Sequence, residues 1–208
     1  MYKRQNDKYV KFLKQKQIPF VAVGKFPDDD VVQVDHDNVG ACKELVTVLF
    51  AKGIQNIAYL GSNMDQMVNR CRYQGYEEAY RKGKRKLNQD LVYTDLSSRA
   101  MVEKAVEELK NSGVECILCQ DDYICDEVVR KLARMGVRIP DQMKVASCHY
   151  SRILENYPVT ITSLKFNITE LGRRSCQVLL DMIHGKTVPD KTLLDYEIIL
   201  KESTNCLL

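Results

Sequence analysis

Polar and aromatic side chains follow four apolar runs of the chain. They are Arg70 and Arg72 shortly beyond residues 57–60, Asp95 after 91–93, Asp121, Asp122 and Tyr123 after 114–119, and Cys148, His149 and Tyr150 after 144–147. If these runs are parallel strands, their carboxyl ends meet at one edge of a sheet, where ligands bind. A carboxylate accepts hydrogen bonds from two adjacent hydroxyls, and an arginine donates through a fixed fork. The pattern therefore predicts a site for a small polyhydroxylated ligand.

Two pairs in this set leave a choice open. Asp121 and Asp122 both lie where a helix needs an N-cap, so one is expected to cap the helix and the other to contact a ligand. Arg70 and Arg72 are two residues apart at a helix start, so at most one points into a cleft. His149 has no second metal-binding residue at ligand spacing, so we expect neither a metal nor a cofactor.

Other motifs favour structural roles over catalysis. The chain lacks the common nucleotide-binding, hydrolase and metalloprotease motifs, and the carboxylates of Asp95 and Asp122 alone are weak evidence for a glycosidase. The basic run at residues 81–86 has no interleaved aromatic residues, so we interpret it as a solvated turn rather than a nucleic-acid site. Cys116 and Cys119 lie in a predicted strand, where side chains three apart point to opposite faces, so they form no metal or redox pair. We therefore expect a protein that is not an enzyme.

Alternating strands and helices must position these residues. Strands are expected at 18–23, 31–34, 57–60, 91–93, 114–119, 144–147, 161–164 and 193–200, and helices at 7–16, 38–53, 69–82, 98–113, 121–136 and 168–184. Asn6 or Asp7 can cap the first helix, and Ser97 or Ser98 the fourth. This alternation predicts an α/β fold with parallel sheets flanked by helices.

Composition limits the remaining classes. The chain has 208 residues, 45% of them apolar, and 31 basic against 28 acidic side chains give a formal charge of only +3. That charge does not favour nucleic-acid binding by this chain. No apolar run is long enough to span a bilayer, and the first residues lack the apolar core of a signal peptide. We expect a cytoplasmic protein without membrane contact, whose eight cysteines are free and mostly buried.

The order of several short motifs resembles the effector-binding domain of LacI/GalR-type transcription regulators, a type I periplasmic-binding-protein fold. The motifs are Ile18-Pro19-Phe20-Val21, Asp37-Asn38 with Gly40-Ala41, Ala51-Lys52-Gly53, Ile57-Ala58-Tyr59-Leu60-Gly61, Arg72-Tyr73-Gln74-Gly75-Tyr76, Asp121-Asp122, Ile139-Pro140, Thr162-Ser163 with Glu170-Leu171-Gly172, and Lys201-Glu202-Ser203-Thr204. They cover nearly the whole chain in the family's order.

The resemblance implies two lobes joined by three crossovers, with the ligand in the cleft. One lobe would hold residues 1–53 and 165–186 and be incomplete, and the other would hold 54–164 and 187–208. It also implies effector contacts by Arg72 and Asp122, and it places Leu96 and Gln66 where members of the family carry contact residues. Tyr123 and His149, which follow predicted strands, complete the expected set of effector contacts. His149 stands where the family carries an aspartate, and Leu96 where many members carry an aromatic residue.

By resemblance, the chain is expected to sense a small sugar or sugar phosphate and to signal allosterically to a DNA-binding domain. The family's DNA reader and its first βαβ units precede the segment that this chain begins with, so operator DNA would be bound only through a domain that this chain lacks. We expect a homodimer, with residues 7–16 and 18–23 at or near the contact. The alternative from the same fold is the solute-binding protein of a sugar transporter.

Overall fold

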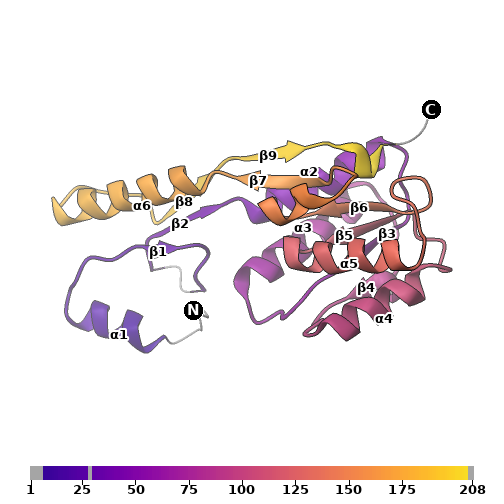
Figure 1. The fold of residues 1–208 in the computed structure, drawn as a ribbon. Coiled ribbons are helices and arrows are strands. Elements are labelled where there is room, and N and C mark those ends of the chain that lie inside the picture. Colours follow the sequence, from indigo (N-terminus) through magenta and orange to yellow (C-terminus); the bar gives the residue numbers. More distant parts are fainter. Residues whose placement is uncertain (1–6, 28–29, 206–208) are drawn as a thin grey trace. The chain divides into compact units, whose positions relative to one another are not determined.

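The computed structural model describes residues 7–27 and 30–205 (Figure 1). Its helices are α1 (Lys8–Gln15), α2 (Asn38–Ala51), α3 (Met67–Lys82), α4 (Arg99–Leu109), α5 (Asp122–Arg134) and α6 (Ile168–Ile183). Its strands are β1 (Ala22–Val23), β2 (Gln33–His36), β3 (Ile57–Leu60), β4 (Val92–Tyr93), β5 (Cys116–Cys119), β6 (Lys144–Ser147), β7 (Thr162–Phe166), β8 (Lys191–Leu194) and β9 (Tyr196–Ile199). Among the described residues, no helix has the length and apolar content needed to cross a bilayer.

The strands form two sheets, which confirms the predicted α/β class. The larger sheet has the order β4-β3-β5-β6-β7-β9, and the pairs from β4 to β7 are all parallel. The smaller sheet has the order β1-β2-β8, also with parallel pairs. Parallel neighbours require crossover connections, and α4 and α5 provide those from β4 to β5 and from β5 to β6.

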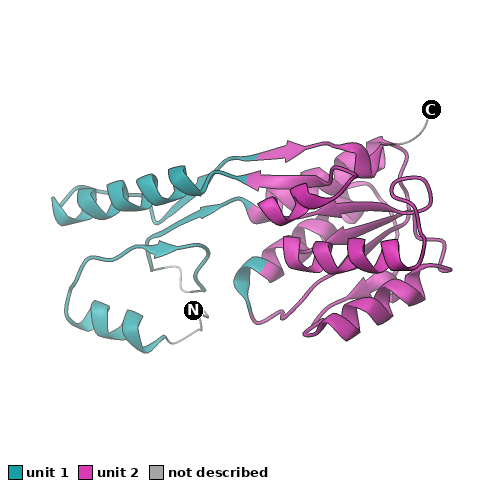
Figure 2. Ribbon diagram, in the orientation of Figure 1, with its two compact units in different colours: residues 1–37, 66–68, 166–196 teal, residues 38–65, 69–165, 197–208 magenta. Residues whose placement is uncertain are grey.

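The chain divides into two compact units (Figure 2). Unit 1 comprises residues 1–37, 66–68 and 166–196, and unit 2 comprises 38–65, 69–165 and 197–208. These bounds differ from the predicted lobes, because α2 groups with unit 2 and β8 with unit 1. β8 pairs with β2 along four residues. In unit 2, a Cβ atom on Gly75 of α3 would lie 2.4 Å from the carbonyl oxygen of Val39 in α2, so the two helices need glycine there.

Unit 2 is built around fully buried strands. All four residues of both β3 and β5 are buried, as parallel strands covered on two faces should be. α4 and α5 cover the sheet with buried aliphatic side chains such as Val106, Leu109 and Leu132. Ser98 caps α4 and Asp121 caps α5, in each case by accepting a hydrogen bond from a backbone N–H of the first turn.

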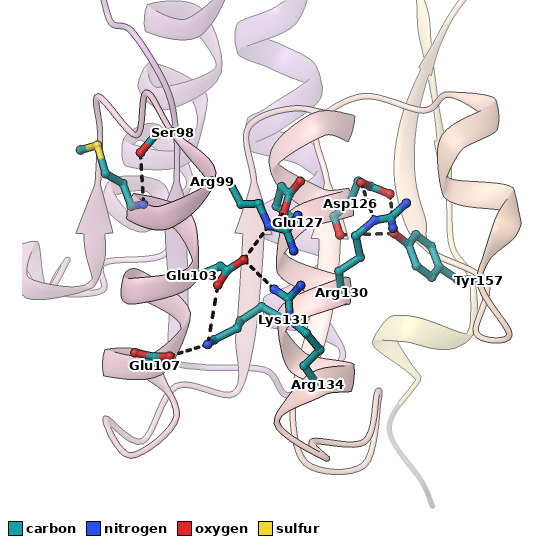
Figure 3. A network of polar contacts seen from close by, with 11 residues as sticks. Ser98, Arg99, Glu103, Glu107, Asp126, Glu127, Arg130, Lys131, Arg134 and Tyr157 are labelled. Atoms are coloured by element: carbon teal, nitrogen blue, oxygen red, sulfur yellow. Dashed lines mark hydrogen bonds and ion pairs between the residues drawn. The ribbon is translucent and has the colours of Figure 1, made fainter.

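An ion-pair network joins the outer faces of α4 and α5 (Figure 3). Glu103 accepts from Arg99 at 2.6 Å within α4 and from Arg134 at 2.7 Å on α5. Lys131 on α5 also pairs with Glu107, and Arg99 lies 3.2 Å from Glu127. Several charges sharing partners in this way hold one another in position better than an isolated exposed pair.

Unit 1 is much less buried. Asp7, one of the two predicted caps, caps α1. None of the residues of α1 is buried. The predicted strand at 18–23 is shortened to β1, because the N–H of Ile18 closes the end of α1 and Pro19 has no N–H to donate. β1 lies at one edge of the smaller sheet.

The predicted final strand at 193–200 is divided in two. β8 ends at Leu194 in the smaller sheet, and β9 begins at Tyr196 in the larger one. The apolar pattern runs through both strands, so it could not reveal that the chain passes from unit 1 to unit 2 between Tyr196 and Glu197.

Seven cysteines lie in the described part of the chain. The helices hold Cys42, Cys71, Cys125 and Cys176, β5 holds Cys116 and Cys119, and Cys148 directly follows β6. All seven are free thiols, and all but Cys176 are buried.

Candidate functional site

The carboxyl ends of β3, β5 and β6 meet at one edge of the larger sheet, within unit 2. Cys119 at the end of β5 lies beside Leu60 of β3 and beside Ser147 of β6. The segments that follow these strands are therefore neighbours, as expected. We call this edge, with residues 61–63, 120–123 and 148–151, the carboxyl edge.

Asp122 lies in the first turn of α5 and is held from the neighbouring segment. Its Oδ1 is 3.1 Å from Nδ1 of His149, which follows β6. Burial would raise the pKa of Asp122, but hydrogen bonds from Ser151 and His149 and the charge of His149 outweigh it and lower the pKa. The Asp122 carboxylate is only 9% exposed and is therefore a fixed acceptor.

The structure resolves the choice between the two aspartates. Asp121 Oδ1 accepts the backbone N–H of Ile124 at 2.9 Å, so Asp121 is the cap of α5. Asp122 is thereby released from capping and contacts His149. An aspartate in the first helical turn also interacts favourably with the helix dipole.

The two arginines of α3 also differ in exposure and in hydrogen-bond partners. Arg72 is 8% exposed, and its Nη1 donates to the carbonyl oxygen of Gln120 at 2.9 Å, two residues before Asp122. The Arg70 side chain is 55% exposed, donates to the Met64 carbonyl and lies 3.8 Å from Asp65. Only Arg72 therefore reaches the carboxyl edge.

Four further predicted residues have different environments. Tyr123 is 72% exposed on the first turn of α5. Leu96 follows β4 and is buried in the apolar core of unit 2, which leaves little of its surface for a ligand. Gln66 belongs to residues 66–68, which group with unit 1, whereas the carboxyl edge belongs to unit 2. His149 is 31% exposed and contacts Asp122 as described above.

The sequence patterns do not predict a polar network that lies beside these residues. Gln120 Oε1 accepts from the backbone N–H of Ser62 at 3.0 Å, and its Nε2 donates to the Ser62 hydroxyl at 3.1 Å. Asn69 of α3 donates to the carbonyl oxygen of Asn63 at 2.7 Å. A Cβ on Gly61 would lie 2.6 Å from Gln120 Oε1, so the glycine permits this network. The position of Gln120 directly after β5 is the only sequence signal for its role.

A pair of thiols lies beneath the carboxyl edge. The sulfur atoms of Cys42 and Cys148 are 3.6 Å apart, and both residues are fully buried. Burial and the neighbouring sulfur raise the pKa of the Cys42 thiol well above its usual range, so it is a neutral packing group. Among the described residues, no cluster of three potential metal ligands occurs.

Comparison with known proteins identifies the family. The family described as "Periplasmic binding protein-like domain" matches residues 46–204. The HTH-type transcriptional regulator CelR of Thermobifida fusca is 26% identical over 205 residues, covering 96% of this chain and 60% of the regulator. The regulator MalR of Streptococcus pneumoniae is also 26% identical, over 97% of this chain and 61% of its own length. The chain thus spans about 60% of the length of these relatives.

Solved structures agree with this result. The complex of the regulator CelR with cellobiose superposes with a TM-score of 0.84 and 25% identity, covering 96% of this chain and 63% of that chain. With its parallel sheets, its motif order and these relatives, the chain belongs to the periplasmic binding protein-like family and corresponds to the effector-binding domain of LacI-type transcription regulators.

Proposed function

We propose that this chain is the sensing domain of a transcriptional repressor and binds a small sugar at the carboxyl edge of unit 2. The observation that carries the proposal is the convergence of two charged groups there: Arg72 is bonded to the Gln120 carbonyl, and Asp122 follows two residues later. Both side chains are buried or nearly so and are held by neighbours. Such preorganised groups discriminate sharply, because a wrong ligand leaves them unpaired.

The two groups divide the work of recognition. Asp122 is an acceptor for sugar hydroxyls, since its lowered pKa keeps it ionised near neutral pH. Arg72 supplies N–H donors from a fixed direction. Tyr123 offers an exposed ring, which suits the apolar face of a sugar. A cellobiose-like sugar is the first ligand to test, because the similar regulator CelR has been solved with cellobiose.

The remaining features of the proposal follow from the relatives, which are transcription regulators. Effector binding would shift the population between two conformations and so control a DNA-binding domain outside this chain. The protein would be cytoplasmic and would not catalyse a reaction. The sugar or sugar phosphate would leave unchanged from the site, whereas an enzyme would consume it.

The site is tested by calorimetric titration of the purified chain with cellobiose, glucose and glucose 6-phosphate. We expect one of these to bind and Asp122→Asn to weaken that binding about tenfold or more, because a charge-assisted hydrogen bond is lost. Arg72→Lys should do the same, since lysine lacks the fork. Arg70→Ala, two residues away and exposed, is the matched control and should keep the affinity.

Two results would contradict the site. One is unchanged affinity in both Asp122→Asn and Arg72→Lys, and the other is an equal loss in Arg70→Ala. Consumption of the sugar during the titration, lost in Asp122→Asn, would replace sensing with catalysis.

We further infer a homodimer formed through unit 1. Tyr9 and Phe12 of α1 and Val23 of the edge strand β1 are about half exposed, which leaves apolar surface that a second copy can cover. Analytical ultracentrifugation at micromolar concentration should give a dimer that Phe12→Glu dissociates. A monomer at all concentrations would contradict this inference.

A further inference from the structure

A cavity of about 270 Å³ lies at the opposite edge of the larger sheet. Gln55 and Asn56, which precede β3, line it together with Asn88 and Leu91, which precede β4. β3 and β4 are parallel, so these residues share the amino edge of the sheet, whereas Arg72 and Asp122 reach its carboxyl edge. Nothing in the proposed sensing function uses this cavity.

The charge lining the cavity has one sign. Arg85 and Lys86, the last two residues of the basic run at 81–86, are its only charged lining residues. The nearby carboxylate of Glu115 is engaged, because its Oε2 accepts the backbone N–H groups of Gln55 at 2.7 Å and Asn56 at 2.8 Å. A cavity with positive lining and engaged neighbouring acid favours an anionic ligand.

Arg85 is held in place before any ligand arrives. Its guanidinium lies 4.4 Å from the ring centroid of Phe50, and one of its N–H groups donates to the side-chain oxygen of Gln55. Its backbone N–H donates to the carbonyl of Tyr80 at 2.9 Å, which ties the segment after α3 to the helix. An arginine has five N–H donors, so these contacts leave others for a ligand. A preorganised guanidinium loses little entropy when it binds a phosphate.

The other walls add an apolar surface and an amide. Tyr80 is 6% exposed and fixed by the hydrogen bond from its hydroxyl to the Ile57 carbonyl at 3.2 Å, and Leu91 is half-buried. The Asn88 amide oxygen accepts the backbone N–H of Asp90 at 3.1 Å, which leaves its amide nitrogen as a donor. The volume is just below the range of about 300–1,000 Å³ typical of drug-sized ligands, so the ligand is small.

We propose that this amino-edge cavity binds a small phosphate monoester, with the phosphate on Arg85 and Lys86 and an apolar or aromatic group against the half-buried Leu91. The guanidinium of Arg85 matches two phosphate oxygens in one plane, and Lys86 contributes a second positive charge. The site is independent of the carboxyl edge, since none of its lining residues lies there.

Calorimetric titration of the full chain with phenyl phosphate tests the proposal, with inorganic phosphate and benzyl alcohol as partial ligands. We expect phenyl phosphate to bind more tightly than either. Arg85→Gln should weaken binding about tenfold, through loss of the charged fork. Lys86→Gln, at an exposed residue whose replacement leaves the fold intact, should weaken it by about threefold.

Lys82→Gln is the matched control, because Lys82 belongs to the same basic run and does not line the cavity. We expect it to keep the affinity, and we expect Asp122→Asn at the carboxyl edge to keep it too. Equal losses in Lys82→Gln and Lys86→Gln, or tighter binding of a single-stranded oligothymidylate that both variants weaken alike, would indicate a diffuse polyanion surface and overturn the cavity site. Equal affinity for inorganic phosphate and phenyl phosphate would overturn the apolar part.

Discussion

Unit 1 and unit 2 contain the same kinds of elements, but they bury them to different degrees. In unit 2, α5 has six buried residues and β5 is buried throughout. In unit 1, α1 has none, α6 has only Ser175 and Val178, and β8 alternates between exposed and half-buried positions. Of the eleven large apolar side chains exposed among the described residues, eight lie in unit 1: Tyr9, Phe12, Ile18, Val23, Ile168, Leu180, Ile183 and Leu193.

This difference in burial indicates which unit contributes most to the stability of the chain. Apolar burial contributes about 25 cal/mol for each Å² removed from water, so unit 2 carries most of the favourable free energy. The exposed apolar surface of unit 1 contributes to stability only when another surface covers it and removes it from water. For this reason we infer that a second copy of the chain binds there. The candidate sugar site belongs to the better-buried unit, whose elements can hold its side chains in fixed positions.

A pair of leucine substitutions tests the difference in burial between the two units most directly. Leu118 in β5 is fully buried, and Leu118→Ala should lower the free energy of unfolding by about 2–5 kcal/mol, because it leaves a cavity. Leu193 in β8 is 63% exposed, and Leu193→Ala should change it by less than about 0.5 kcal/mol. Urea denaturation followed by circular dichroism measures both values. Equal losses would contradict the contrast between the units.

The contrast also explains which elements the sequence could predict. The bounds of β3 and β6 match the predicted strands at 57–60 and 144–147. For β3 the reason is its continuous apolar run, which marks a strand buried on both faces. Ser98 and Asp121 were among the predicted caps, since capping depends on local chemistry. In unit 1, by contrast, the strand expected at 18–23 is reduced to two residues, where burial does not reinforce the local preference.

What the sequence could not supply depends on contacts between distant residues. The order β1-β2-β8 pairs Gln33 with Lys191, and no local pattern encodes that register. The network of Gln120 with Ser62 likewise joins residues 58 positions apart. Arg72 and Asp122 were chosen from the family resemblance, and the distinction from Arg70 and Asp121 is visible only in the burial and hydrogen bonds that the fold creates.

A buried histidine makes the stability of unit 1 depend on pH. His36 in β2 packs against Phe166, with ring centroids 4.9 Å apart, and both belong to unit 1. Burial lowers the pKa of His36, although a hydrogen bond with the Asn167 backbone and the charge of Asp35 oppose it. The unfolded chain, with a histidine pKa of about 6.5, therefore binds the proton more readily than the folded chain. The stability that depends on neutral His36 is complete above about pH 6.5 and is lost as the pH falls toward the folded pKa.

We therefore expect the melting temperature to fall between pH 7.5 and pH 5.5, and His36→Gln to flatten part of that fall. His184→Gln is the matched control, because His184 is exposed at the end of α6. Differential scanning fluorimetry across this pH range measures the slopes. If His184→Gln flattens the curve as much as His36→Gln, the effect does not come from the burial of His36.

The smallest expected effect is a difference in melting temperature between variants that lose a surface ion pair in unit 2 and in unit 1. Glu103 in unit 2 accepts from Arg99 and Arg134, and these contacts lower its pKa, whereas Glu170 in unit 1 pairs with Arg173, three residues along the same helix α6. Glu103→Gln should lower the melting temperature more than Glu170→Gln, because it removes a link between two helices rather than a contact within one. Both losses should shrink at high salt, since ions screen exposed pairs. Thermal melts at low and high sodium chloride measure them, and a larger loss in Glu170→Gln would show that the network adds nothing to its separate pairs.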